Sequence, residues 1–220
     1  MPFDHNDHYH GTLLRRVPSG CARALDVGCG TGRFARRLAA RGIEVDAVDP
    51  AAEVIEAARA AGGGPRFQQA DITDMELPEG HYDFVSCLAS IHHVPFGTVA
   101  RLRDALAPGG VLAILGCYPE RTAVDYAWSL VAVPANAVAR AAVALREAGA
   151  RGGAVRDGGV RDGGAWGGAV RAPVRSPEMS LAEIRREAGV LLPGARISRL
   201  LFWRYLLVYR RPGDAVPPAG

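Results

Sequence analysis

The first half of the chain alternates short apolar runs with longer segments whose apolar residues recur at helical spacing. The apolar runs predict strands at 22–28, 44–50, 66–71, 82–89 and 111–118. Helices are predicted between them at 34–42, 51–62 and 98–110, and glycines end the first two. Strands separated by helices of this length form parallel βαβ units, so the pattern predicts a doubly wound α/β sheet with helices on both faces.

The pattern changes after the fifth predicted strand. Residues 122–148 are rich in alanine and valine and are interrupted at Pro134, which predicts one or two inserted helices that form a cap at 119–150. Residues 151–173 repeat glycine, arginine and aspartate with little to bury, which is typical of a flexible loop. In the remaining segment, 174–212, a helix is predicted at 180–194 from its Ser180 and Glu183 capping box.

The last apolar segment, 197–212, is rich in aromatic and branched residues and has no room for a helical crossover between its halves. It predicts two adjacent strands joined by a tight turn around Trp203 and Arg204, so the sheet ends with an antiparallel strand. These segments add up to a seven-stranded, mainly parallel sheet. A length of 220 residues, 49% of them hydrophobic, fits one domain, with a core at 21–118 preceded by residues 1–20.

Composition and charge narrow the classes of function. The 26 basic and 23 acidic residues leave a formal charge of +3, and the arginines are scattered, which argues against a nucleic-acid partner. The four cysteines form no CxxC pair, so we expect reduced thiols in a cytoplasmic protein rather than a zinc site or a disulfide scaffold. The N-terminal residues do not form a secretory leader, and no apolar run is long enough to span a bilayer, so neither export nor stable membrane insertion is expected.

The sequence LDVGCGTG, at 25–32, lies where the first predicted strand meets the first predicted helix. Its glycines allow a tight turn that brings backbone N–H groups and the helix N-terminus close to the negative end of a ligand. The dinucleotide fingerprint GxGxxG is not matched, because its last glycine would fall at Arg33. Asp49, at the tip of the second strand, is placed to accept hydrogen bonds from both hydroxyls of a ribose. The alternative is that Asp49 caps a helix before Pro50.

A third element concerns the base of a nucleoside. Asp71, in QQADI, can accept a hydrogen bond from an adenine amino group while Ile72 packs on the ring, and LAPGGVL at 106–112 supplies the turn into the fifth strand. With these elements the chain resembles the class I S-adenosylmethionine-dependent methyltransferases, particularly the small-molecule branch related to ubiquinone, menaquinone and natural-product methyltransferases. The resemblance covers residues 20–118 and also includes YDFVSCLA, which leads to SIHHV.

The resemblance implies a Rossmann-like fold, S-adenosyl-L-methionine as cofactor, and methyl transfer to an oxygen or nitrogen atom of a small, apolar or aromatic metabolite. The implied cofactor-binding residues are Tyr9, His10, Asp26, Gly28, Cys29, Gly30, Gly32, Asp49, Pro50, Asp71, Ile72, Leu88 and Ala89. In related enzymes an N-terminal segment folds over the cofactor, so residues 1–20 are expected to form a lid with Tyr9 and His10 facing the pocket. We expect no metal, because the histidines and aspartates of DHNDHYH, at 4–10, match no rigid ligand spacing.

Two adjacent histidines, His92 and His93, follow the fourth strand, where the resemblance places the reacting methyl group. It implies that His93 or His92 is the catalytic base, since a neutral imidazole can take the proton of an acceptor. The family pattern is incomplete here, because the fifth strand ends in LGCYPE without an aspartate to pair with the histidine; Glu120 or Tyr118 could take that place. The alternative is that one histidine caps the next helix while the other contacts the cofactor.

Other functions stay open. The apolar stripe of the inserted segment, which includes Tyr126 and Trp128, is consistent with an acceptor-binding wall, a dimer face or a membrane-surface contact. The fold could also bind the cofactor without turnover, or serve an NAD-dependent oxidoreductase, against which Arg33 and the Asp71–Ile72 pair argue. The expected partner is a small-molecule methyl acceptor bound by a monomer or homodimer.

Overall fold

The structure is a computed structural model that describes residues 5–119, 176–201 and 203–213. Seven strands form one sheet in the order β3-β2-β1-β4-β5-β7-β6. They are β1 (Arg23–Val27), β2 (Glu44–Asp49), β3 (Arg66–Gln69), β4 (Tyr82–Leu88), β5 (Leu106–Cys117), β6 (Arg196–Arg199) and β7 (Arg204–Arg210). Strands β1 to β5 pair in parallel, whereas β7 pairs antiparallel with both β5 and β6. The predicted seven-stranded, mainly parallel sheet with a reversed C-terminal strand is confirmed.

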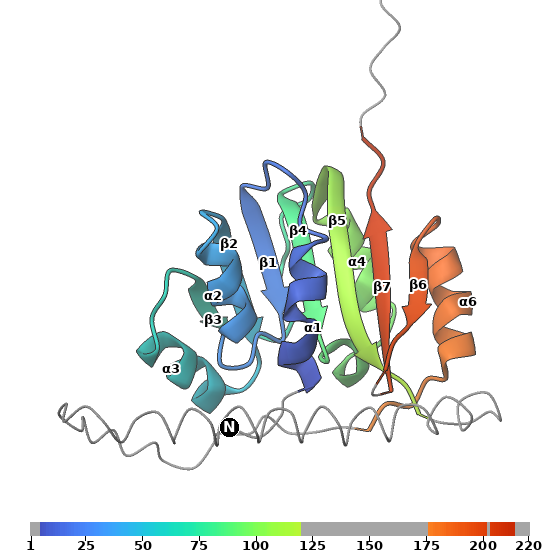
Figure 1. The fold of residues 1–220 in the computed structure, drawn as a ribbon, viewed down its shortest axis with the longest axis horizontal. Coiled ribbons are helices and arrows are strands. Elements are labelled where there is room, and N and C mark those ends of the chain that lie inside the picture. The colour runs from blue at the N-terminus through green and yellow to red at the C-terminus, as the bar shows by residue number, and fades with distance from the viewer. Residues whose placement is uncertain (1–4, 120–175, 202, 214–220) are drawn as a thin grey trace, which may run out of the picture.

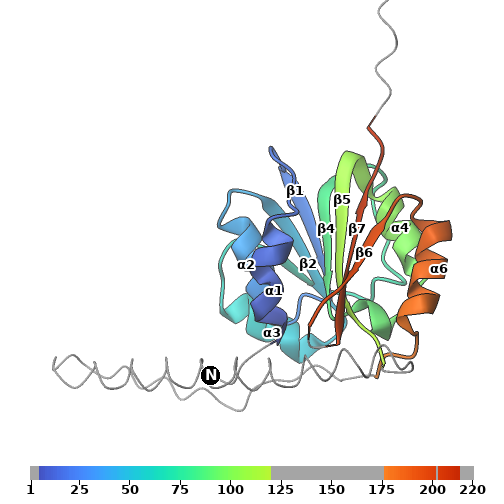
Figure 2. The same ribbon diagram turned by 45° about the vertical axis from the view of Figure 1, so that its right-hand side comes forward.

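Helices cover both faces of this sheet, as Figures 1 and 2 show. One face carries α1 (His5–Leu14), α2 (Arg33–Ala39) and α3 (Ala52–Ala60), and the other carries α4 (Thr98–Asp104) and α6 (Leu181–Leu191). Because successive strand residues point to opposite faces, β5 contributes Val111, Ala113 and Leu115 to the first core and Leu112 and Ile114 to the second. The sheet is therefore buried on both sides, which explains why its central strands are almost uniformly apolar.

Two boundaries differ from those that the sequence pattern predicts. The helix predicted at 98–110 ends at Asp104, and β5 begins at Leu106, so LAPGG belongs to the strand rather than to a turn before it. Pro108 has no N–H with which to continue a helix, and the chain at Gly109 and Gly110 instead exchanges backbone hydrogen bonds with Arg211. β6 ends at Arg199 and β7 begins at Arg204, so Arg204 belongs to the strand rather than to the turn.

Some predicted segments cannot be compared with the structure. The predicted cap helices at 122–148, the predicted loop at 151–173 and Glu120 lie outside the described residues.

The helix predicted at 180–194 is α6, and its capping box is present. The Ser180 hydroxyl accepts from the Glu183 N–H, and the Glu183 carboxylate accepts from the Ser180 N–H.

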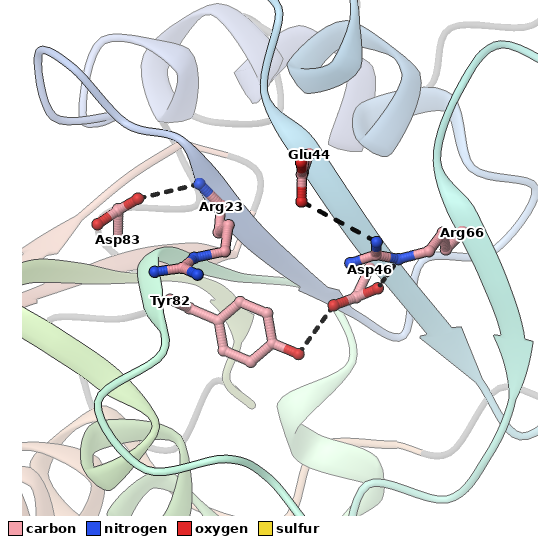
Figure 3. A network of polar contacts seen from close by, with 6 residues as sticks. All are labelled: Arg23, Glu44, Asp46, Arg66, Tyr82 and Asp83. Carbon is pink, nitrogen blue, oxygen red and sulfur yellow. Dashed lines mark hydrogen bonds and ion pairs between the residues drawn. The ribbon is translucent and has the colours of Figure 1, made fainter.

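A polar network joins the first residues of the parallel strands (Figure 3). Asp46 of β2 accepts from the Arg66 guanidinium of β3 at 2.7 Å and from the Tyr82 hydroxyl of β4 at 3.0 Å. Asp83 accepts from the Arg23 N–H at the start of β1 at 2.9 Å. Since these contacts lie where the strands begin, the network ties together the edge of the sheet opposite to the one where the strands end.

Candidate functional site

The glycine-rich turn connects β1 to α2 and is fastened to both neighbouring strands. The N–H groups of Gly28 and Cys29 donate to the Val48 carbonyl of β2 at 2.8 and 3.0 Å. On the other side, the Ser90 hydroxyl donates to the Val27 carbonyl at 2.6 Å, and a Cβ added to Gly28 would lie 2.2 Å from the Ser90 Cβ. The turn therefore needs glycine at position 28, where φ is also positive at 67°.

The middle of the turn is open. A Cβ added to Gly30 would meet no atom within 4 Å, although φ is 54° there. Gly32, with φ of 74°, is instead packed against the Phe67 ring. The main chain of the turn is thus rigidly supported from behind and accessible at Gly30, as a backbone cradle for a ligand requires.

Asp49 is the last residue of β2, and only 6% of it is exposed. One carboxylate oxygen accepts from the Gly30 N–H and the other from the Ala51 N–H, each at 3.0 Å. The carboxylate therefore joins the glycine-rich turn to the start of α3, whose N-cap residue is Ala51 rather than Asp49. A carboxylate oxygen has two lone pairs, so each oxygen can accept a second hydrogen bond.

Asp26 lies beneath the turn, fully enclosed in the end of β1. The Ser86 hydroxyl of β4 donates to its carboxyl group at 2.7 Å. Burial raises the pKa of Asp26 to about 7 against the opposing effect of this hydrogen bond, and the charge of Asp49 adds to the rise. Burial, followed by the charges of Asp26 and Asp49, also raises the pKa of the Cys29 thiol, so this cysteine is a neutral, packed side chain.

Asp71 begins a tight turn after β3. Its carboxylate accepts from the Thr73 N–H at 2.9 Å and from the Thr73 hydroxyl at 2.8 Å, and these two bonds hold the pKa of Asp71 below its ordinary value. Asp71 is exposed, whereas Ile72 is buried in the core on the α4 side of the sheet.

The segment after β4 turns sharply toward the two histidines. Ala89 has φ of 52°, which is uncommon for a residue with a side chain, and its N–H donates to the Leu115 carbonyl of β5 at 2.7 Å. Ile91–His93 then form one turn of 3₁₀ helix in which the half-buried rings of His92 and His93 lie 4.2 Å apart. Gly97 is the N-cap residue of α4, so neither histidine holds the capping position.

Two candidate residues from α1, Tyr9 and His10, are buried beside the turn. The Tyr9 hydroxyl donates to the Leu201 carbonyl at 3.0 Å, and the His10 ring lies 5.1 Å from the Phe34 ring of α2. Tyr9 belongs to the same core as Cys29, and His10 is a buried polar residue next to it in α1. Tyr118, considered as a partner for the histidines, is also buried, and the Arg199 guanidinium lies 5.3 Å from the centre of its ring.

The parallel strands bring most of these groups to one edge. The glycine-rich turn follows β1, Asp49 ends β2 and the histidine pair follows β4, and these three strands are neighbours in the sheet (Figure 1). Ligands of doubly wound folds bind at this carboxyl edge. Sequence reasoning missed Ser86 and Ser90, which support Asp26 and the turn. A signal for Ser86 was present, since it is a polar residue inside an otherwise apolar buried strand.

Within residues 5–119, 176–201 and 203–213, no group of three or more histidine, cysteine, aspartate or glutamate side chains could hold a metal ion. Among the helices in this described part of the chain, none is long and apolar enough to cross a membrane.

Comparisons with known proteins agree on one family. A sequence profile described as a methyltransferase domain matches residues 25–114. Uncharacterized methyltransferases of Mycobacterium bovis and Mycobacterium tuberculosis are 35% identical to the chain over 217 residues, covering 96% of it and 98% of their own length. A ubiquinone biosynthesis O-methyltransferase of Xanthomonas axonopodis is 33% identical over 133 residues, which cover 57% of this chain and 54% of that protein.

One solved structure extends the comparison to the fold of nearly the whole chain. The magnesium protoporphyrin IX methyltransferase of Synechocystis, solved with bound S-adenosylhomocysteine, aligns with a TM-score of 0.55 over 94% of this chain and 81% of its own. At 19% identity, this similarity concerns the fold alone.

Proposed function

The chain belongs to the class I S-adenosylmethionine-dependent methyltransferases, and on this premise we propose that it methylates an oxygen or nitrogen atom of a small, apolar or aromatic metabolite. The observation that carries the proposal is the meeting of the glycine-rich turn, Asp49 and the histidine pair at one edge of the sheet. This edge offers a cradle for the cofactor next to groups that can handle a proton.

The residues at this edge fit S-adenosyl-L-methionine. Gly30 leaves the main chain of the turn open for the methionine end, with Gly28, Cys29 and Gly32 shaping the turn and the Asp26 carboxyl group beneath it. Each oxygen of Asp49 has a remaining lone pair for a ribose hydroxyl, next to Pro50.

The adenine is assigned to the turn after β3. The exposed carboxylate of Asp71 accepts from Thr73 through one oxygen, which leaves the other for the adenine amino group, and Ile72 lies next to it. Leu88 is the last residue of β4 and Ala89 follows it directly. From α1, Tyr9 shares a core with Cys29 of the glycine-rich turn, and His10 packs against Phe34 of α2. We therefore retain residues 1–20 as the segment that closes over the cofactor.

When bound, the cofactor supplies an electrophilic methyl group on a positively charged sulfur. The chain contributes alignment and proton handling. His93, or else His92, would accept the proton of the acceptor hydroxyl or ammonium group on a ring nitrogen. This would leave the acceptor atom an electron pair for the methyl carbon, whose bond to sulfur would break with its electrons staying on sulfur. The strained backbone at Ala89 fixes where the 3₁₀ turn with these rings begins.

Two observations favour oxygen as the acceptor atom. A ubiquinone biosynthesis O-methyltransferase is 33% identical to 57% of this chain. A hydroxyl group is also a poor nucleophile until it loses its proton, so a histidine base matters more for oxygen than for a neutral amine.

The same proposal covers the acceptor-binding wall, the oligomeric state and the cellular compartment. We assign the acceptor wall to the cap at 119–150 and expect a monomer or homodimer without a nucleic-acid partner. The four cysteines of the described chain are free thiols, which supports a reducing compartment such as the cytoplasm.

The proposal is tested by calorimetric titration of the purified protein with S-adenosylmethionine and S-adenosylhomocysteine, with NAD as the control. We expect micromolar binding of the two adenosyl ligands alone, followed by transfer of labelled methyl to phenolic or catecholic acceptors in a screen. Folded protein that binds neither adenosyl ligand would overturn the proposal.

A further inference from the structure

The turn after β3 is organised from two sides. The N–H groups of the turn donate to Asp71. Its carboxylate accepts from Thr73, and its carbonyl accepts from the N–H groups of Asp74 and Met75 at 3.1 Å. These bonds are local to the turn, so they fix its shape but do not fix its position against the rest of the protein. Before the turn, β3 is a four-residue strand at the edge of the sheet, and the Ala70 N–H donates to the Asp49 carbonyl at 3.1 Å. Within the turn, the Ile72 side chain is buried in the core.

The carbonyl side of the same turn is held by one arginine of α4. The Arg101 guanidinium donates to the carbonyls of Ile72, at 3.0 Å, and of Thr73 and Met75. Arg101 is half-buried, and α4 is fixed by Val99 and Leu102, which are fully buried in the core. The planar, multi-donor guanidinium can hold several carbonyls at once, which a lysine ammonium does with less defined geometry.

We propose that Arg101 is the positioning residue of the adenine subsite. It contacts neither cofactor nor acceptor; it fixes the turn that carries Asp71 and Ile72 at the distance that the adenine amino group and ring require. This inference rests on the proposed function, since it assigns a role within the same cofactor site. It predicts that the affinity for adenosyl ligands depends on an arginine of α4 that acts on them only through the turn after β3.

Arg103 provides a matched control on the same helix. Its guanidinium also donates to a backbone carbonyl, that of Leu191 at the end of α6, at 2.8 Å, and it pairs with Asp104. Loss of Arg103 should therefore disturb α4 packing as loss of Arg101 does, but without releasing the turn after β3.

The test compares Arg101→Met, Arg101→Lys and Arg103→Met with the wild type by calorimetric titration with S-adenosylhomocysteine, at a temperature where each protein is folded. We expect Arg101→Met to raise the Kd about tenfold, a change of about 1.4 kcal/mol. The Kd of Arg101→Lys should lie between those of Arg101→Met and the wild type. The Kd of Arg103→Met should stay within about twofold of the wild-type value, even if its Tm falls as much as that of Arg101→Met. If Arg101→Met does not fold, the lysine variant alone decides.

A second ligand separates positioning from general destabilisation. In S-inosylhomocysteine an oxygen replaces the adenine amino group, so the ratio of its Kd to that of S-adenosylhomocysteine reports the contact assigned to Asp71. This ratio should shrink at least about threefold in Arg101→Met and stay unchanged in Arg103→Met. Equal Kd values for the Arg101 and Arg103 variants, or an unchanged ratio, would overturn the inference. Wild-type protein that binds no adenosyl ligand would instead overturn the proposed function.

Discussion

Asp49 has two tasks, because its carboxylate holds the backbone and is also the proposed partner of the ribose. In Asp49→Ala, the N–H groups of Gly30 and Ala51 lose their acceptor in a nearly closed site, which should cost about 1–3 kcal/mol of stability. The same change should weaken S-adenosylhomocysteine binding at least tenfold. Denaturant unfolding and calorimetric titration measure the two effects separately.

The neighbouring acid Glu53 is the control for charge. It is exposed in the first turn of α3, so Glu53→Ala removes a nearby negative charge without touching the turn. Its stability and its affinity should both stay close to wild type. An Asp49→Ala protein that is destabilised but binds with unchanged affinity would show that the carboxylate supports the backbone alone.

Variants of His92 and His93 distinguish cofactor binding from methyl transfer. If His93 or His92 is the base, its replacement by glutamine should slow methyl transfer by about 10²–10⁴-fold while changing the Kd for S-adenosylhomocysteine by less than about twofold. Single-turnover rates and titrations of both variants test this, each serving as the control for the other. Wild-type transfer should also slow in acid, because a protonated imidazole cannot accept a proton. Full rates in both variants would remove the base from the mechanism.

The sequence predicted where most strands and helices lie, because their local signals agree with the fold. The Asp-Pro stop after β2 and the capping box of α6 are examples, and both hold in the structure. The start of β5 could not be predicted, because Leu106 pairs with Tyr82 of β4, and Gly109 and Gly110 bond to Arg211, about one hundred residues away. For the same reason no local pattern pointed to Arg101, whose carbonyl partners belong to a separate turn.

The capping box of α6 permits a test of one such local signal. Ser180→Ala removes the acceptor of the Glu183 N–H and the donor to its carboxylate, so it should lower the free energy of unfolding by about 1 kcal/mol. Ser198→Ala, at an exposed position of β6, is the control and should change it by a few tenths at most. Denaturant melts of both variants give the comparison, and equal losses would mean that the cap contributes nothing of its own.

Acidic groups at the two edges of the sheet make the stability of the protein respond to pH in opposite directions. At the starting edge, burial works to raise the pKa of Asp46, but the hydrogen bonds from Arg66 and Tyr82 outweigh it and hold the pKa below 3.8 (Figure 3). This contribution to stability is present above the unfolded pKa and is lost as the pH falls through the folded one. At the carboxyl edge, burial raises the pKa of Asp26 in the folded protein to about 7, so this group makes the protein less stable as the pH rises rather than as it falls.

Asp26 should therefore make the protein less stable as the pH rises from about 4 to about 7. In that window the unfolded chain has lost the proton of Asp26 while the folded protein keeps it, because ionisation would place a charge in a closed interior beside Asp49. The loss should amount to about 2–4 kcal/mol and level off above pH 7. Asp26→Asn keeps the shape without the charge, so its denaturant stability should decline less than that of the wild type between pH 4.5 and 8. Parallel declines in the two proteins would place the pH-sensitive group elsewhere in the fold.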